Sequence, residues 1–227
     1  MSIKRQLVVA ALLAVPLLGL FFWWGFRTPP FSIINGRTLV DWLREVEFEG
    51  FQHKVAANEV LYAAGPKIIP TLSRVLRQPD FPLMARLPSA WIPESMRARD
   101  SDQKKIRANA AWVISVIVHR NPDCPGSLSA VPSLIAGLSS HSQQVRYVSA
   151  QGLAAIGASA SNAVPALVLR VADDSSSVRF CAIEALGRIG FCSTGTLQIV
   201  RTALADTNGD VRIVATQALA RLEVKTE

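Results

Sequence analysis

Residues 178–186 read VRFCAIEAL, and this stretch decides the fold because the chain carries it three times. The other two copies are VRYVSAQGL at 145–153 and VRIVATQAL at 211–219, so the step from one copy to the next is constant. A looser copy begins upstream at Ile106, after a somewhat longer step, and a more degenerate one begins at Lys54. A fixed period between about 20 and 50 residues is typical of proteins built from stacked repeats.

The copies follow the period of an α-helix. Apolar side chains in one copy occupy positions i, i+4, i+7, i+8 and i+11, which line one face of a helix, as in Val178, Ala182, Ala185, Leu186 and Ile189. Gly190, directly after this stripe, fits a carboxyl-terminal cap. The pattern therefore predicts one amphipathic helix in each repeat.

A second apolar segment precedes each of these helices, at 131–135, 164–168 and 197–200. Pro132 and Pro165 occupy equivalent positions in two of them, and they predict helix starts because proline is tolerated in a first helical turn. Each repeat is then a helical hairpin. Because neither helix can bury its apolar face alone, neighbouring hairpins must stack into a solenoid.

The motif Val-Arg-x-x-Ala-x-x-Ala-Leu-Gly-x-Ile-Gly, which begins at Val178, resembles the HEAT repeat in its phycocyanobilin-lyase-like bacterial form. The resemblance is strong over 129–222 and weaker over 50–115. The segment GRTLVDWL at 36–43, which follows a short apolar run, also resembles the start of membrane-anchored or exported bacterial HEAT-repeat proteins. The resemblance implies an all-α fold, an α-α superhelix of about five hairpins. It also implies protein binding rather than catalysis, although the family name covers bilin-attaching lyases.

Arginine and aspartate recur in register with the repeats. The residues are Arg146, Arg179 and Arg212, with Asp173 and Asp206 five residues before the second and third copies. The arginines could form an anion-binding ladder. The resemblance to HEAT repeats implies instead that these side chains bond between adjacent repeats, and we favour this structural role because charges near a buried interface are usually paired.

The amino terminus predicts a membrane anchor. Lys4 and Arg5 precede residues 7–26, which carry no charge and as a helix would span about 30 Å, the thickness of a bilayer core. Trp23 and Trp24 suit a membrane interface. A cleaved signal peptide is the alternative, but the run is longer than a typical signal core. We expect a single-pass anchor at 1–27, preceding an extracytoplasmic domain.

The remaining chain divides into three parts. Residues 28–49 are expected to form a linker and a first helix around 39–46, and 50–227 the solenoid. An insertion at about 79–103 interrupts the repeats with four prolines and Trp91. It is either a binding loop or a segment packed across its own repeat.

Charge and composition argue against several function classes. The net charge is +7, but residues 108–227 carry 9 basic and 8 acidic side chains, so the regular repeats lack the basic surplus of a nucleic-acid-binding surface. The three cysteines form no CxxC pair, and the three histidines stand apart from nucleophile or metal-ligand motifs. We expect no catalytic residue, no metal, no cofactor and no small-molecule substrate.

A partner-binding surface is predicted on the repeated helices, in the i, i+4 row beside the apolar stripe. Its members are Tyr147, Gln151, Phe180, Glu184, Arg188, Ile213, Gln217 and Arg221. Apolar groups ringed by polar ones are typical of interface anchors, although the apolar members could instead pack against a neighbouring helix. The resemblance to HEAT solenoids places this row on the concave side. We therefore expect a non-catalytic, membrane-tethered scaffold for a protein partner. The alternative is a bilin lyase, or a chaperone-like factor acting on a partner subunit.

Overall fold

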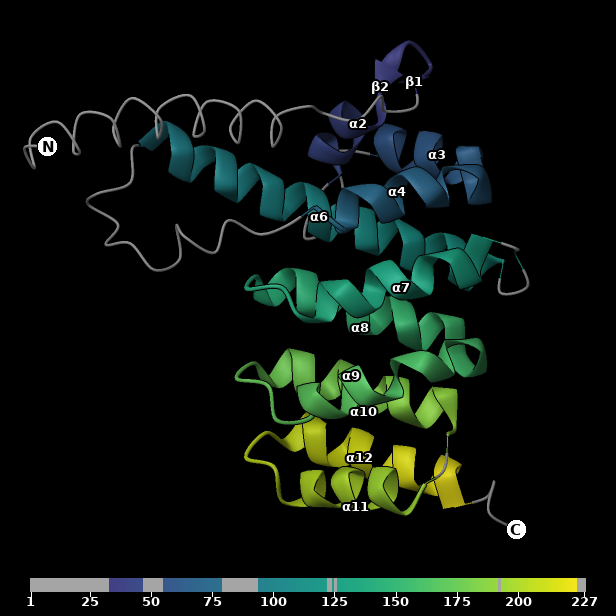
Figure 1. The fold of residues 1–227 in the computed structure, drawn as a ribbon, viewed down its shortest axis with the longest axis vertical. Coiled ribbons are helices and arrows are strands. Elements are labelled where there is room, and N and C mark those ends of the chain that lie inside the picture. The colour runs from purple at the N-terminus through teal and green to yellow at the C-terminus, as the bar shows by residue number, and fades with distance from the viewer. Residues whose placement is uncertain are drawn as a thin grey trace, which may run out of the picture. The chain divides into compact units, whose positions relative to one another are not determined.

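The computed structural model describes residues 33–46, 55–78, 94–121, 124, 126–191 and 193–223, all within one compact unit, Ile33–Glu227. The predicted membrane anchor at 7–26 and the prolines and Trp91 of the predicted insertion lie outside these residues. Within them, helices account for nearly all of the regular structure (Figure 1). The expected all-α solenoid is confirmed for the repeats.

A short β-hairpin, which the sequence patterns did not predict, precedes the first helix. Strand β1 (Ile33–Ile34) pairs antiparallel with β2 (Arg37–Thr38) through a turn at Asn35 and Gly36, whose φ angles are 49° and 76°. Asn-Gly is the dipeptide that this two-residue turn favours, because both positions need a positive φ. The hairpin is fastened to the next helix by Trp42, whose Nε1 donates to the Ile34 carbonyl over 2.9 Å.

Five helix pairs of the described residues follow in chain order, and Figure 1 shows them stacked along the solenoid. The pairs are α2 (Leu39–Glu45) with α3 (Val55–Ala64), α4 (Ile69–Leu76) with α6 (Glu94–Arg120), α7 (Gly126–Leu138) with α8 (Gln143–Ile156), α9 (Val164–Arg170) with α10 (Ser176–Ile189), and α11 (Thr194–Thr202) with α12 (Gly209–Glu223). Short 3₁₀ turns, η1 (Gly65–Ile68), η3 (Gly157–Ala163) and η4 (Ala203–Ala205), lie between or beside them.

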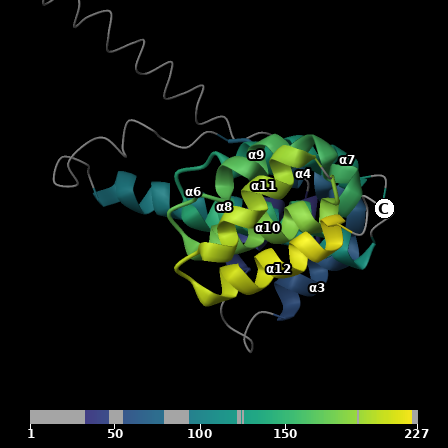
Figure 2. The same cartoon turned by 90° about the horizontal axis from the view of Figure 1, so that it is seen from below.

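The pairs make two layers, which Figure 2 shows from the end of the stack. We call α4, α7, α9 and α11 the A layer, and α3, α6, α8, α10 and α12 the B layer. Consecutive B helices pack on one another, and in the A layer α4 contacts α7 and α7 contacts α9. The repeated motif forms α8, α10 and α12, so its apolar stripe builds the core between the layers.

Small residues let the B helices approach closely. A Cβ on Gly187 of α10 would lie 2.9 Å from both Cα and Cβ of Ala218 on α12. That distance is shorter than real Cβ contacts, so only glycine fits here without moving a helix. Gly187 is therefore required by the packing of α10 on α12.

The first helix is held by a buried side chain that the sequence analysis did not single out. Asn109 of α6 is 3% exposed, and its Nδ2 donates to the carbonyls of Leu43 at 2.8 Å and Val46 at 2.9 Å. Carbonyls at the end of a helix lack partners within the helix, so Asn109 caps α2 from the neighbouring repeat.

The two proline predictions have different outcomes. Pro165 lies in the first turn of α9, as predicted. The prediction for Pro132 is wrong, because α7 begins at Gly126 and contains the proline. Proline cannot bond the carbonyl four residues earlier, which belongs to Leu128. Pro132 is exposed and Leu128 is 58% exposed, so this part of the helix faces solvent, where water can satisfy that carbonyl.

Helix α6 is much longer than the other B helices. It has 27 residues against 14 in α10, and its amino-terminal part extends beyond the stack (Figures 1 and 2). Residues 94–103, the described part of the predicted insertion, form its first turns. Arg44 Nε of α2 donates to Asp102 Oδ2 over 3.0 Å, which links this extension to the first repeat.

One helical stretch among the described residues, Gln143–Arg170, is long and apolar enough to cross a membrane. It comprises α8, η3 and α9 in the middle of the stack, and core helices of packed proteins meet the same criterion.

Candidate functional site

Two arginines of the repeated motif bridge neighbouring repeats. Arg146 Nε and Nη2 each donate to a different carboxylate oxygen of Asp173, both over 2.8 Å. Arg179 makes the equivalent pair with Asp206 at 2.7 and 2.8 Å. Each arginine lies in the first turns of a B helix, and each aspartate lies in the connection between the A and B helices of the next repeat. Two parallel bonds fix the geometry of such a pair more tightly than one.

Arginines of the motif, Arg212 among them, also donate to backbone carbonyls of their own repeats. The Nη1 atom of Arg179 donates to the carbonyls of Asp173 and Asp174, and Arg212 donates in the same way to Asp206 and Thr207. The guanidinium of Arg179 thus joins two repeats. Its side chain is only 15% exposed, which leaves little of it open to an external anion.

The electrostatic environment favours charged aspartates in these pairs. Burial alone would raise the pKa of Asp173, but the hydrogen bonds from Arg146 and from the Ser175 N–H outweigh it, so the pKa lies below its ordinary value. The hydrogen bond from Arg179 lowers the pKa of Asp206 in the same direction. Both carboxylates therefore keep their charge to a lower pH than an unperturbed aspartate does.

One repeat upstream, a serine occupies the position of the aspartate. Arg107, the arginine of the looser copy, is 5% exposed and donates from Nε to the Leu76 carbonyl over 3.2 Å. Ser140 stands where Asp173 stands one repeat later, and its Oγ accepts from the Ser142 N–H over 3.1 Å, as Asp173 accepts from Ser175.

The predicted partner-binding residues lie on the B layer, and their exposure increases towards the carboxyl terminus. We call the surface formed by these eight residues the B face. It also includes Tyr62, Trp112 and Arg120, three further residues of the B layer whose contacts are given below. Tyr147, Gln151, Phe180 and Glu184 are half-buried. Arg188 and the members on α12, Ile213, Gln217 and Arg221, are exposed.

Contacts between the helices explain the half-buried members. Burial raises the pKa of the Tyr147 phenol above its ordinary value, with smaller effects from Cys181 and Glu184 of α10. Tyr147 therefore lies against the next repeat, as the packing alternative predicted, while remaining partly exposed. Ile213 on the last B helix is 59% exposed. The row is thus partly packing surface and partly open surface.

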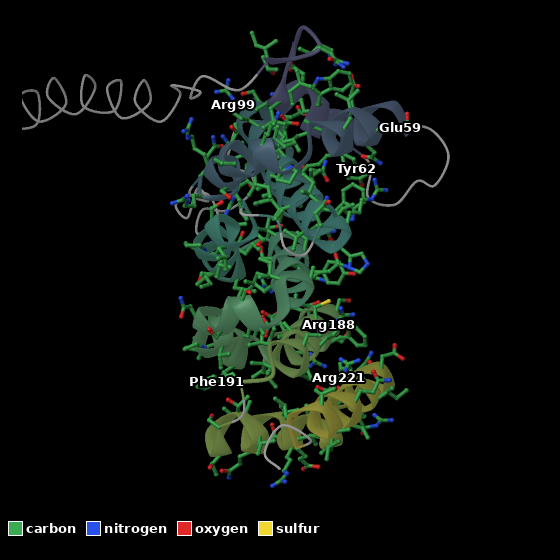
Figure 3. All side chains as sticks on the ribbon, turned by 90° about the vertical axis from the view of Figure 1, so that its right-hand side faces the viewer. Glu59, Tyr62, Arg99, Arg188, Phe191 and Arg221 are labelled. Carbon is green, nitrogen blue, oxygen red and sulfur yellow. The ribbon has the colours of Figure 1, made fainter. Side chains whose placement is uncertain are left out.

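An aromatic cluster on the same layer escaped the sequence analysis. The rings of Tyr62 (α3) and Trp112 (α6) have centroids 6.1 Å apart and are tilted by 54°. Arg120 Cζ lies 4.4 Å from the centroid of the Tyr62 ring, within cation–π range. Trp112 occupies in the looser copy the position of Gln151, so an alignment of the copies could have revealed it. Tyr62 lies on the same side of the array as Arg188 and Arg221 (Figure 3).

Nucleophiles and metal ligands do not gather in the described part of the chain. No group of three His, Cys, Asp or Glu side chains there could hold a metal ion. Cys124 and Cys181 are buried free thiols, and burial with the nearby Glu184 charge raises the pKa of Cys181 to about 12. His119 and His141 are exposed on different repeats, and His53 and Cys192 lie outside the described residues.

The stacked helical hairpins and their inter-repeat Arg–Asp pairs define an α-solenoid repeat protein. Residues 131–220 match a protein-family model described as HEAT repeats. No curated protein matches the chain.

Several solved structures are similar in fold. An engineered protein aligns with a TM-score of 0.54 and 19% identity over 74% of this chain and 66% of its own, so the chain spans just under two thirds of that protein. A designed armadillo repeat protein in complex with the peptide (KR)4 aligns with a TM-score of 0.46 and 16% identity, covering 81% of this chain and 99% of its own. The complex of CpcE and CpcF of phycocyanin lyase from Nostoc sp. PCC7120 aligns with a TM-score of 0.48 and 19% identity, covering 86% and 69%. These likenesses concern the fold.

Proposed function

We propose that the chain is a non-catalytic scaffold that binds a protein partner through the B face, while residues 7–26 tether it to a membrane. The observation that carries the proposal is the B face itself. Four successive B helices, α6 to α12, each contribute a side chain at the same repeat position: Trp112, Gln151, Glu184 and Gln217. A partner can therefore contact several repeats at once.

Apolar side chains flank this row. Tyr147 and Phe180 are half-buried and held by their repeats, so little rotamer freedom is lost when a partner covers the rest of their rings. Large side chains fixed in this way, with polar groups around them, carry most of the binding energy in protein interfaces. These properties support a binding surface on the solenoid.

The uncharged run at 7–26 supports the tether. A scaffold held on a membrane meets partners on the same surface at a raised effective concentration, so moderate affinity suffices. We place the solenoid on the extracytoplasmic side. A bilin lyase remains the alternative enzyme function, and it predicts that a tetrapyrrole, visible by its absorbance, accompanies the purified chain.

The test is crosslinking in cells followed by affinity capture of the full chain. One variant carries Tyr147→Ala, Phe180→Ala and Ile213→Ala, and Ile213→Ser alone serves as a second variant because that exposed side chain is not needed for folding. We expect both variants to lose a partner that the unchanged chain captures, the triple variant more completely.

A matched control removes apolar surface elsewhere. Leu128, Leu169 and Leu204 are 58%, 67% and 43% exposed on α7, α9 and η4, so their replacement by alanine deletes comparable apolar groups outside the B face. This control should capture the partner normally. Loss of the partner in the control but not in the B-face variants would contradict the proposed surface, provided that circular dichroism shows all chains folded.

A further inference from the structure

Three parallel rows of side chains cross the B helices. The first is Tyr147, Phe180 and Ile213, the second is Gln151, Glu184 and Gln217, and the third is Arg188 and Arg221. Within a helix the rows are four residues apart, so they are neighbours on its surface. Each row has at most one member per repeat and follows the stacking direction. A ligand lying along the rows would meet the same kinds of group at regular intervals.

The repeat spacing matches a particular backbone conformation. Packed helices lie about 8–10 Å apart. An extended polyproline II segment rises about 3.1 Å per residue and turns once every three residues, so one turn covers about 9.3 Å. Every third side chain of such a segment faces the same way and meets the next repeat. A β-strand alternates its side chains every two residues and would not keep this register.

The B face is basic near the carboxyl ends of α6, α10 and α12. Arg120, Arg188 and Arg221 stand there, and Glu184 accepts from Arg188 Nε over 3.0 Å. Glu223 at the end of α12 is engaged by Arg201 of α11 at 3.0 Å. Arg188 and Arg221 occupy equivalent positions one repeat apart, and Figure 3 shows both on the same side of the array as Tyr62.

We propose that the B face binds an extended segment of the partner protein that carries carboxylate side chains three residues apart. This inference rests on the proposed function and names the kind of segment that the surface recognises. Two carboxylates of the segment pair with Arg188 and Arg221. Arg188 keeps its contacts to Glu184 through Nε and Nη2, and its Nη1 donates to the carboxylate of the partner.

The other two rows hold the body of the segment. The exposed side-chain amide of Gln217 bonds its peptide groups, because an amide offers both donors and an acceptor. Gln151, whose Oε1 is buried, contributes donors from its amide nitrogen. Tyr147, Phe180 and Ile213 pack against apolar side chains of the segment. Aromatic surfaces suit polyproline II segments in particular, since such segments lose little entropy on binding.

The test uses synthetic fluorescein-labelled peptides and the purified full chain, with fluorescence anisotropy as the readout. The probe is (Glu-Pro-Pro)4, whose twelve residues span about 37 Å in polyproline II form and so match four B helices. The comparison peptides are (Gln-Pro-Pro)4, (Lys-Pro-Pro)4 and a peptide of four consecutive glutamates followed by eight prolines. We expect (Glu-Pro-Pro)4 to bind tightest, and its affinity to fall as salt is raised.

Charge reversal identifies the surface. The double variant Arg188→Glu and Arg221→Glu should weaken (Glu-Pro-Pro)4 binding about tenfold or more, because like charges then face each other. The matched control, Arg74→Glu and Arg77→Glu, makes the same change in net charge on two exposed arginines at α4 of the A layer and should change the affinity less than about twofold.

Each contrary outcome overturns a defined part of the inference. Equal binding of (Lys-Pro-Pro)4 refutes the preference for carboxylates, and equal binding of the clustered-glutamate peptide refutes the three-residue spacing. Equal effects of the two double variants refute the placement on the B face. If no peptide binds while the B-face variants still lose the partner in cells, the scaffold function stands and only this inference falls.

Discussion

Replacing Asp206 with alanine tests whether the Arg–Asp pairs couple adjacent repeats. The change removes two hydrogen bonds from Arg179 and one from the Asn208 N–H, which is 2.8 Å from Asp206 Oδ1. Both side chains of the pair are mostly buried, at 15% and 11% exposed. Hydrogen bonds to charged groups contribute about 1.5–3 kcal/mol, so we expect the last repeat to lose about 2 kcal/mol of its coupling to the stack.

The loss should be local. In a solenoid each repeat contacts only its neighbours, so weakening one interface mainly affects the units that share it. A loss of about 2 kcal/mol corresponds to roughly 30-fold more frequent opening. Hydrogen exchange followed by mass spectrometry should therefore show about 30-fold faster exchange in α11 and α12, with α7 and α8 unchanged.

An exposed ion pair in the same repeat provides the control. Arg201 and Glu223 join α11 to α12 at 3.0 Å, but their side chains are 59% and 53% exposed. Exposed pairs contribute about 0–1 kcal/mol, so Glu223→Ala should barely change exchange. If Asp206→Ala and Glu223→Ala had the same small effect, the inter-repeat pairs would not stabilise the stack and our reasoning would be refuted.

Packing and charge give three further predictions. The pKa of Asp206 is lowered in the folded chain, so its charged form stabilises the fold. Urea titrations should show a stability difference between the unchanged chain and Asp206→Asn that is constant above about pH 5 and shrinks as the pH falls through the folded pKa. A difference that instead grew in acid would contradict this. In urea unfolding, Gly187→Ala should destabilise the fold by about 1–3 kcal/mol because the added Cβ would collide with Ala218. The control Gly195→Ala should be neutral or stabilising, because its Cβ would come no closer than 4.0 Å to its nearest neighbour. Burial raises the pKa of the Cys181 thiol to about 12, so iodoacetamide at about pH 8 should leave it unmodified until denaturant is added. Peptide mass spectrometry would show this. Rapid labelling of the native chain would mean that α10 opens readily.

The parts of the fold that repeat were predictable from the sequence. The constant step between copies marks α8, α10 and α12, and Gly190 caps α10 with a left-handed φ of 68° as its position suggested. Local rules suffice there, because helical periodicity and capping act within one segment.

The failures have identifiable physical causes. Pro132 was misread because only the folded structure shows that the solvent-facing side of α7 tolerates a proline in its interior. The hairpin at Asn35 and Gly36 was missed although Asn-Gly is a strong local indicator, because its strands are only two residues long. Asn109 could not have been found, since the carbonyls that it caps lie 63 and 66 residues away in sequence.

The candidate site was predictable as a row but not in its composition. The helical period placed the eight predicted residues on the B helices. Their unequal burial depends on which neighbouring helix covers them, and a sequence pattern does not contain that information. Trp112 was missed because the row was drawn only from the three copies with the constant step, and the looser copy, which follows a longer step, was not aligned with them.

Photocrosslinking from single positions in cells reports which face of the solenoid contacts the partner. A benzoylphenylalanine residue is incorporated in place of Gln217 on α12 of the B face, or in place of Gln198 on α11 of the A layer, both of which are exposed. We expect illumination to link a protein partner to the chain from position 217 and to leave position 198 without that adduct. Adducts from position 198 alone, or equal adducts from both positions, would contradict a scaffold that binds its partner through the B face.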